Sequence, residues 1–85
     1  MTTWVEKLNF VGMLFECLSW DYPKDTPPVC RVQVFYNNRR SGLSAFGSGE
    51  TLEEALEDAA IRLPTDWRSV ERKITEREWN KIAHL

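Results

Sequence analysis

The chain offers few side chains of the kind that catalyse reactions. A nucleophilic mechanism needs a serine, threonine or cysteine held against a base, which is usually histidine. The only histidine is His84, next to the C-terminal residue, where we expect a solvated side chain without fixed geometry. A zinc site needs about four closely spaced Cys or His ligands, and Cys17, Cys30 and His84 do not provide them. We therefore expect no enzyme, no metal site and no cofactor.

Carboxylate pairs are the second candidate for chemistry. Glu53 with Glu57, and Glu54 with Asp58, are each four residues apart, which places both members of a pair on one side of a helix. Such pairs can bind a hard cation or transfer protons. Because they fall on the outward face of an expected surface helix, with no cleft indicated, we interpret them as a solvated acidic face.

A glycine-rich turn, Gly47-Ser48-Gly49, precedes this helix and has the outline of an anion cradle. It lacks the spaced glycines and the Lys-Ser/Thr pair of a phosphate-binding loop. Glu50, Glu53 and Glu54 would also repel a phosphate at this position. The turn therefore gives no case for a phosphate site.

The elements that must position these side chains are clearest at residues 51–63. Thr51 and Glu54 form a capping box: the hydroxyl accepts from the Glu54 amide, and the carboxylate reaches back to the Thr51 amide. Small and apolar residues then recur at helical spacing, namely Leu52, Ala55, Leu56, Ala59, Ala60 and Leu63. We expect a helix that lies close to the core and ends before Pro64.

The N-terminal segment is predicted to be a long helix, from about Trp4 to Ser19, with Thr3 and Glu6 as a second capping box. One apolar face follows at helical spacing, with Trp4, Leu8, Val11, Phe15 and Leu18. A second stripe lies roughly opposite, with Phe10, Met13, Cys17 and Trp20. Either a C-terminal segment covers this second stripe, or a homodimer or other partner does. In the remaining alternative, residues 10–20 form a strand.

An antiparallel hairpin is the best-defined β-structure. Val29–Asn37 alternates between two faces, with Cys30, Val32, Val34 and Tyr36 on one side and Arg31, Gln33 and Phe35 on the other. An Asn- and Gly-containing turn follows, with Arg39 and Arg40 at its tip. Residues 43–46 then return as a shorter strand. The preceding segment, residues 21–28, is a proline-rich loop.

The segment 67–85 allows two interpretations. Trp67, Val70 and Ile74 fit one face of a helix, but Val70, Arg72 and Ile74 also fit an alternating strand. A third capping box begins at Thr75, so we expect a break there and a terminal helix from about Glu76. The chain is therefore predicted to be one α+β domain, residues 1–85, in the order α-β-β-α-α with two short C-terminal helices. A third strand at 67–74 is the alternative.

The composition is that of an ordinary globular protein, with 42% hydrophobic and 28% charged residues. The net charge of −2 gives no general attraction to nucleic acid or to an anionic membrane. Cys17 and Cys30 could form one disulfide, but the N-terminus lacks a signal-peptide pattern, and its apolar run is too short to span a bilayer. We expect reduced thiols in a cytosolic protein.

Residues 47–63 are similar to the closing part of double-stranded-RNA-binding domains, through Gly47-Ser48-Gly49, Ala55, Ala59-Ala60 and Leu63. The resemblance implies a first helix, a sheet, and a closing helix that begins after the glycine turn. That family begins the closing helix with lysines that contact phosphates across a groove. This chain has Thr51, Glu53 and Glu54 there, so the resemblance implies a shape and not RNA binding.

The first partner hypothesis is another protein. Residues 50–58 contain five acids and no base, and such a patch steers binding toward a basic surface, such as the nucleic-acid site of a target. The patch consists of Glu50, Glu53, Glu54, Glu57 and Asp58. In general character the chain is similar to phage-encoded inhibitors, including anti-CRISPR proteins. The alternative is an acidic helix that only keeps the protein soluble.

Two further partner hypotheses use other residues. A nucleic-acid-binding module would stack bases on aromatic side chains and contact phosphates with arginines, using Arg31, Phe35, Arg39, Arg40 and Phe46. A structural homodimer would use the second apolar stripe of the N-terminal segment, Phe10, Met13, Cys17 and Trp20.

Overall fold

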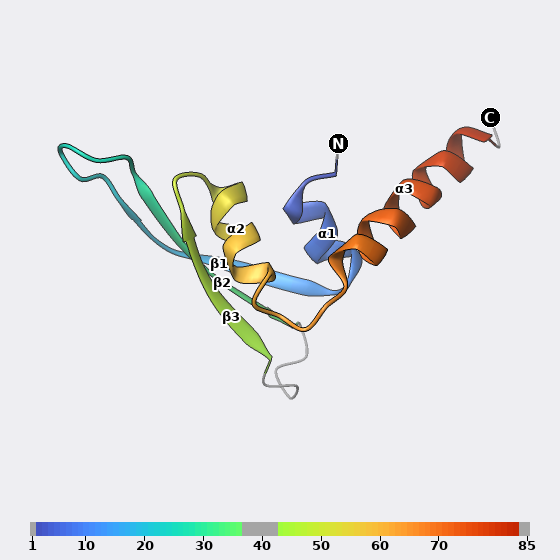
Figure 1. Cartoon of the computed structure of the whole chain (residues 1–85), viewed down its shortest axis with the longest axis horizontal. Coiled ribbons are helices and arrows are strands. Elements are labelled where there is room, and N and C mark those ends of the chain that lie inside the picture. The colour runs from blue at the N-terminus through green and yellow to red at the C-terminus, as the bar shows by residue number, and fades with distance from the viewer. Residues whose placement is uncertain (1, 37–42, 84–85) are drawn as a thin grey trace.

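The structure is a computed structural model that describes residues 2–36 and 43–83. This part of the chain contains three helices and one three-stranded antiparallel sheet, so the predicted α+β class is confirmed. In chain order the elements are α1 (Trp4–Phe10), β1 (Met13–Asp21), β2 (Val29–Tyr36), β3 (Ser44–Gly49), α2 (Leu52–Ala60) and α3 (Trp67–Ala83) (Figure 1).

The sheet is built around β2, which pairs antiparallel with β1 on one side and with β3 on the other. Val34 lies opposite Phe15 of β1 and opposite Ala45 of β3. Helix α2 packs on β2 and β3, and α1 packs beside it on β1, so both helices cover the same face of the sheet. The core between these layers is centred on fully buried side chains, Leu8, Cys30, Val32, Val34 and Leu56.

The predicted helix from Trp4 to Ser19 is wrong beyond Phe10, and the strand alternative is correct. Helix α1 ends at Phe10, and Gly12 adopts a φ of +78°, a left-handed conformation that glycine adopts readily and that a continuing α-helix excludes. Met13 then begins β1, whose backbone pairs with β2. The order is therefore α-β-β-β-α-α, and the third strand comes from the N-terminal segment.

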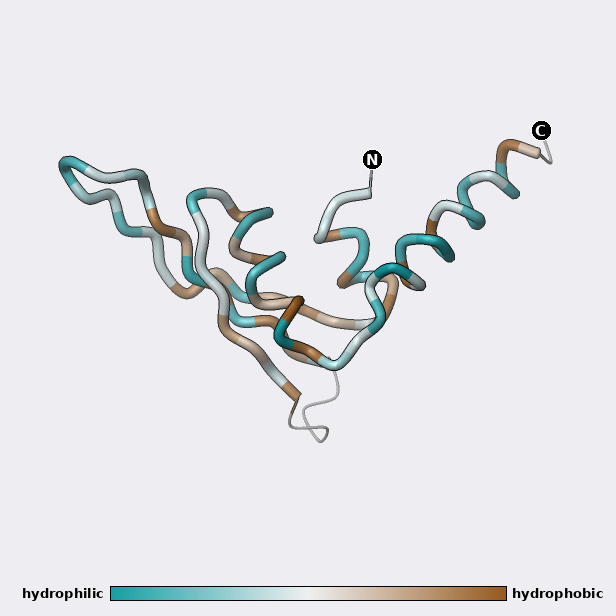
Figure 2. The backbone as a smooth tube through the Cα atoms, in the orientation of Figure 1, coloured by the Kyte–Doolittle hydropathy of each residue, from teal (hydrophilic) through white to brown (hydrophobic). Residues whose placement is uncertain are grey.

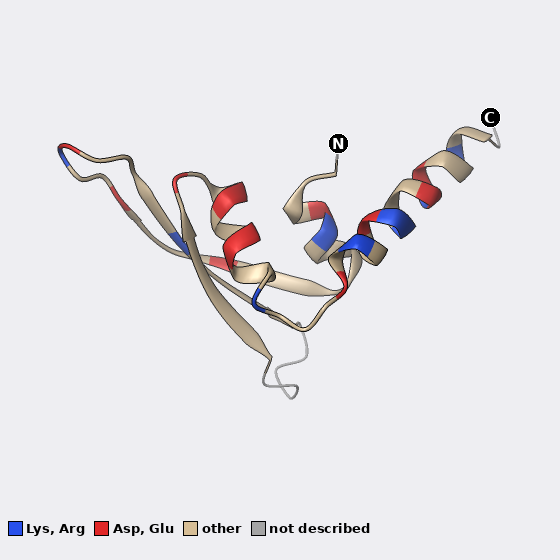
Figure 3. Cartoon of the chain, viewed as in Figure 1, with Lys and Arg blue, Asp and Glu red and all other residues tan. Residues whose placement is uncertain are grey.

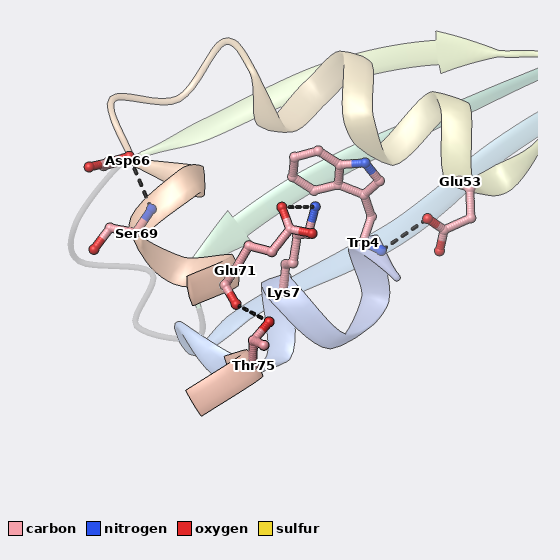
Figure 4. Close-up of polar contacts among 7 residues, drawn as sticks. All are labelled: Trp4, Lys7, Glu53, Asp66, Ser69, Glu71 and Thr75. Carbon is pink, nitrogen blue, oxygen red and sulfur yellow. Dashed lines mark hydrogen bonds and ion pairs between the residues drawn. The ribbon is translucent and has the colours of Figure 1, made fainter. Parts of the chain in front are cut away.

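The predicted interruption of the C-terminal segment is also wrong. Residues 67–83 form one continuous helix, with neither a strand at 67–74 nor a break at Thr75. The Thr75 hydroxyl donates to the Glu71 carbonyl at 2.9 Å, one turn back within the helix, so it does not cap a new one (Figure 4). The helix begins at Trp67, and the carboxylate of the preceding Asp66 accepts from the Ser69 amide at 3.2 Å.

The predicted start of α2 is confirmed in its main contact. Thr51 is the N-cap, and its hydroxyl accepts from the Glu54 amide at 3.1 Å. The Glu54 carboxylate accepts from the amide of Glu50 at 3.0 Å, one residue before the predicted donor.

The expected Gly-Ser-Gly turn is part of β3. A Cβ on Gly47 would lie 2.4 Å from both the Ala55 carbonyl oxygen and the Ala59 nitrogen. Glycine on the strand and alanines on the helix therefore allow the two backbones to approach closely.

Helix α3 is held to the body by its first turns only. Trp67 donates from its indole nitrogen to the Ala60 carbonyl at 2.9 Å and contacts Trp4 edge-on at 5.2 Å between ring centroids. The Lys7 ammonium lies 3.6 Å from the Glu71 carboxylate and 4.2 Å from the Trp4 ring centroid (Figure 4). Beyond this junction the helix runs away from the sheet (Figure 1) and is mostly hydrophilic (Figure 2).

None of the helices in residues 2–36 and 43–83 combines the length and the hydropathy that crossing a bilayer requires.

Candidate functional site

The outer face of α2 carries the predicted acidic patch, shown red in Figure 3. The inner face is closed by the buried residues Ala55, Leu56, Ala59 and Ala60, so the acids of the helix are directed away from the core. No basic residue lies within Leu52–Ala60. The structure therefore places the five predicted acids on and just before one short helix.

Three of these acids also hold the fold together. Glu53 accepts from the Trp4 amide at 2.9 Å, at the start of α1 (Figure 4). Glu54 accepts from the Glu50 amide at 3.0 Å, and Asp58 accepts from the Ser48 amide of β3 at 3.0 Å. A carboxylate has about four acceptor positions and keeps its charge when one of them is filled by a neutral amide. The patch therefore remains negative although part of it is structural.

Glu50 and Glu57 differ from the other three acids. Both are exposed, and within residues 2–36 and 43–83 neither carboxylate forms a hydrogen bond or an ion pair. In the Glu53–Glu57 pair, only Glu53 accepts an internal hydrogen bond, whereas both members of the Glu54–Asp58 pair accept one. Within the part of the chain that the structure describes, no three His, Cys, Asp or Glu side chains are grouped so as to hold a metal ion. His84 lies outside the described residues.

The face of the sheet that α1 and α2 do not cover, which we call the open face, carries several apolar side chains. Leu14 lies opposite Phe35, and Gln33 lies opposite Phe46, and directly paired residues point to the same side of a sheet. Leu18 is 47% exposed, Leu14 44% and Phe46 58%, while Phe35 is half-buried between its neighbours. Pairing places Leu14, Phe35 and Phe46 on the open face, and Leu18, the unpaired residue of β1, lines a pocket with Arg31 and Phe46.

The open face ends at the edge strand β3, beside α2. A shallow open pocket there is lined by Leu18, Arg31 and Phe46 from the sheet and by Asp58 and Arg62 from the region of α2. The Arg62 guanidinium lies 3.4 Å from the Asp58 carboxylate. A molecule that covers Phe46 would therefore also come close to one end of the acidic patch.

The described charges of the open face are Arg31, Asp21 and Glu16, so this part of the face has no net positive charge. Arg31 is exposed and forms an ion pair with Asp21, and Glu16 lies opposite Gln33. Three of the predicted nucleic-acid residues, Arg31, Phe35 and Phe46, do share this face, but the arginine charge is offset by its partner. Arg39 and Arg40 lie outside the described residues.

The predicted dimer stripe is not one surface. Phe10 is the last residue of α1, while Met13, Cys17 and Trp20 are on β1. Met13 is only 2% exposed and belongs to the core. Trp20 stacks on Tyr22, with 6.1 Å between ring centroids. The stripe assumed a helix through residues 10–20. In the sheet, Met13, Cys17 and Trp20 pair with Tyr36, Val32 and Cys30, so they share the face that the helices cover and where Met13 is buried, while Phe10 lies on α1.

The two cysteines meet across β1 and β2. Both thiols are free, and their Sγ atoms are 3.9 Å apart. Cys17 is exposed, whereas Cys30 is fully buried. Burial, together with the hydrogen bond and the charge of Cys17, raises the pKa of the Cys30 thiol above its ordinary value.

Sequence reasoning missed Leu14 and Leu18 as surface residues because it placed them in a helix. The available signal was alternation along the segment. Met13, Phe15 and Cys17 occupy every second position, as on one face of a strand, and Leu14 and Leu18 fall on the positions between or beside them, as on the other face. Comparison of the chain with protein-family models, with curated proteins and with solved structures finds no match. We therefore infer a function from the exposed surfaces of the molecule.

Proposed function

We propose that this protein is a small binding module that attaches to another protein through the open face of its sheet. The observation that carries the proposal is the exposure of Leu14, Leu18 and Phe46 around the half-buried Phe35. A single exposed apolar side chain is ordinary, whereas an apolar patch on one face is typical of an interaction site. A covering partner would remove these side chains from water.

The shape of the molecule supports a missing layer. Its extents are 51 × 32 × 17 Å: the long dimension comes from α3 and the β1–β2 loop, which project from the body (Figure 1), and the short dimension is that of a sheet with helices on one face. Helices α1 and α2 cover one face of the sheet only. A sheet with apolar side chains on both faces is most stable when both faces are covered, and a bound protein would supply the second cover.

The charges of the open face favour a protein over a nucleic acid. Binding to a phosphate backbone draws most of its affinity from arginines and lysines that displace counterions. Here the Arg31 charge is offset by Asp21, and Glu16 adds a negative charge on the same face. Large apolar side chains with few charges around them are instead the composition of a protein interface, in which a few such side chains supply most of the affinity.

The acidic patch on α2 extends the proposal to the class of partner. Four acids on α2 and Glu50 just before it, with no base within Leu52–Ala60, attract a positively charged surface. Because Asp58 lines the pocket beside Phe46, one partner can contact the apolar face and approach the acidic helix together. We propose a target with a basic, nucleic-acid-binding surface, which this protein would occupy as a stoichiometric inhibitor without catalysing a reaction.

The order of α1, the sheet and α2 supports a proposed likeness in outline to double-stranded-RNA-binding domains. However, α2 opens with Thr51, Glu53 and Glu54, which would repel the phosphates that the lysines of that family contact. The likeness to small phage-encoded inhibitors is one of general character.

The test is capture of the partner from the cells that contain this protein, followed by calorimetry with the purified partner. Phe46→Asp, at a side chain 58% exposed on the open face, should weaken binding at least tenfold, because hot-spot side chains supply roughly 2 kcal/mol or more each. Ile82→Asp changes a side chain 64% exposed near the end of α3, on the part of that helix that runs away from the sheet, and should bind as the wild type does. Equal binding by both variants would refute the proposal.

A second candidate, single-stranded nucleic-acid binding, is favoured by one observation: Phe35 and Phe46 share a face with Arg31. Aromatic side chains on such a face can stack with bases. A salt-sensitive gel shift with single-stranded RNA or DNA that Phe46→Asp abolishes would support this candidate. A dimeric mass in light scattering that Phe46→Asp makes monomeric would show that the partner is a second copy of the chain.

A further inference from the structure

The cysteines are 13 residues apart in the sequence but adjacent in space. Their Sγ atoms are 3.9 Å apart on neighbouring strands. A disulfide has an S–S length of about 2.05 Å, so bond formation requires the two sulfurs to approach by about 2 Å. Rotation of one or both side chains about the Cα–Cβ bond covers distances of this size.

The backbone between the two cysteines is irregular. Trp20 lies opposite Cys30 and Cys17 lies opposite Val32, with a shift of register between Cys17 and Ser19. The three steps along β1 from Cys17 to Trp20 therefore span the same length as the two steps along β2 from Val32 to Cys30. A bulge of this kind disrupts the ladder locally and bends the strand, so the backbone can adjust there without separating the rest of the sheet.

The two sulfurs differ in their access to solvent. Cys17 is exposed, and Cys30 is fully buried beneath the helices. A solute in water therefore reaches Cys17, while Cys30 reacts only with a group that is already inside the sheet, such as the neighbouring sulfur. Burial and the neighbouring Cys17 raise the pKa of Cys30, which further reduces its reaction with solutes, because the thiolate is the reactive form.

We propose that Cys17 and Cys30 form a reversible redox site, in which a peroxide oxidises the two thiols to one disulfide that joins β1 to β2. Cys17 is the residue that meets the peroxide, and Cys30 is the residue that resolves the oxidised sulfur. The proposal stands independently of the partner proposed above.

The chemistry balances in two steps. The Cys17 thiolate attacks one oxygen of hydrogen peroxide, the O–O bond breaks, and the leaving hydroxide takes up the Cys17 thiol proton as water, which leaves a sulfenic acid on Cys17. The Cys30 thiolate then attacks the Cys17 sulfur, the S–O bond breaks, and hydroxide leaves as water with the Cys30 proton. The two sulfurs lose two electrons, and the peroxide oxygens gain them. A thiol reductant reverses the product by exchange through a mixed disulfide.

The test uses the full chain, first reduced and then treated with one to two equivalents of hydrogen peroxide at low micromolar protein concentration. After alkylation under denaturing conditions, intact mass should fall by about 2 Da with no added alkyl group, and dithiothreitol should restore two alkylatable thiols. Peptide mapping should find residues 17 and 30 in one cross-linked pair.

Single substitutions assign the two roles. Cys30→Ser should consume peroxide as fast as the wild type but stop at a Cys17 sulfenic acid, which a dimedone probe traps. Cys17→Ser should consume peroxide at least about tenfold more slowly, because the remaining thiol is buried. Circular dichroism of both variants checks that they fold, and labelling of the folded wild type checks independently that Cys17 is alkylated before Cys30.

Three outcomes would overturn the proposal. The first is a wild-type protein that keeps two alkylatable thiols after treatment. The second is a gain of oxygen on Cys17 without loss of about 2 Da. The third is a disulfide found only between two molecules.

Discussion

The backbone amide of Trp4 donates a 2.9 Å hydrogen bond to the carboxylate of Glu53, 49 residues further along the chain. This contact ties the beginning of α1 to the first turn of α2, the helix that carries the acidic patch (Figure 4). The first amides of a helix have no partner within that helix, and a negative charge is favourable there. Glu53 therefore serves the fold as well as the surface.

Glu53→Ala should destabilise the protein by about 1 kcal/mol, because it removes a charged acceptor from the start of α1. Glu57→Ala, on the same helix but exposed, should change stability by less than about 0.5 kcal/mol. Urea denaturation followed by tryptophan fluorescence measures both. Equal losses from the two variants would contradict the assigned role of Glu53.

Gly47→Ala should cost about 2 kcal/mol or more, because the added methyl group would lie 2.4 Å from backbone atoms of Ala55 and Ala59. The backbone of α2 would have to move away from β3. Ser48→Ala, at an exposed position one residue further on, is the control and should be nearly neutral. Thermal unfolding followed by circular dichroism provides the comparison. A melting temperature unchanged by Gly47→Ala would show that the helix and strand are not in tight contact.

Charge reversal of Glu50 and Glu57 should weaken binding to a basic target without weakening the fold. These two acids are exposed and are the best probes, since reversing Glu53 or Glu54 would also remove internal hydrogen bonds. We expect the association rate to fall about tenfold at low salt, and the difference to shrink at high salt.

Surface plasmon resonance at two ionic strengths measures this effect. Reversal of Glu76 and Glu78, which are exposed on the projecting part of α3, is the matched control. Equal association rates for the wild type and the Glu50/Glu57 variant would mean that the acidic residues do not steer binding and only keep the protein soluble.

The stability of the reduced protein should fall as pH rises above the ordinary thiol pKa of about 9.0. The pKa of Cys30 is higher in the folded protein than in the unfolded chain, because burial disfavours the thiolate. Above the ordinary value the unfolded chain loses the Cys30 proton and the folded protein keeps it, so unfolding becomes more favourable. This contribution is complete below the unfolded pKa and disappears as pH rises through the folded one.

Urea denaturation with a reductant at pH 8 and pH 10 measures this effect. Cys30→Ala removes the group, and its loss of stability between the two pH values should be smaller than that of the wild type. An equal loss in both proteins would assign the pH dependence to other groups.

Ile74→Ala should cost about 2–4 kcal/mol, because this side chain is 7% exposed at the junction of α3 with the body. Ile82→Ala, two turns further along the same helix and 64% exposed, should cost less than about 0.5 kcal/mol. Urea denaturation separates the two. A large loss from Ile82→Ala would show that the end of α3 packs against another surface.

Local signals predicted the part of the fold that depends on neighbouring residues. The start of α2 follows from Thr51 and the amide of Glu54, and the two faces of β2 follow from strict alternation around Val32. The fate of residues 13–21 depends on pairing with β2, a contact between distant residues that periodicity does not contain. Phe15 fits a helical face with Leu8 as well as a strand face with Met13, and the positive φ of Gly12 decides between them.

The candidate sites follow the same division. The acids of α2 could be named from their spacing, because a helix with a known inner face also has a known outer face. Their internal bonds to Trp4 and Ser48 could not, since these partners come from other elements. Leu14 and Leu18 were missed for the same reason: the open face exists only once β1 has joined the sheet.

The hydrogen bond from the Ser48 amide to Asp58 has a consequence for self-association. β3 is an edge strand, and unpaired edge amides are templates on which further strands can add, from other copies of the chain. Because Asp58 occupies one of these amides and places a negative charge beside the others, strand addition along β3 is opposed at the point where the apolar Phe46 would encourage it. We therefore expect Asp58 to oppose the pairing of β3 with a strand from another copy of the chain.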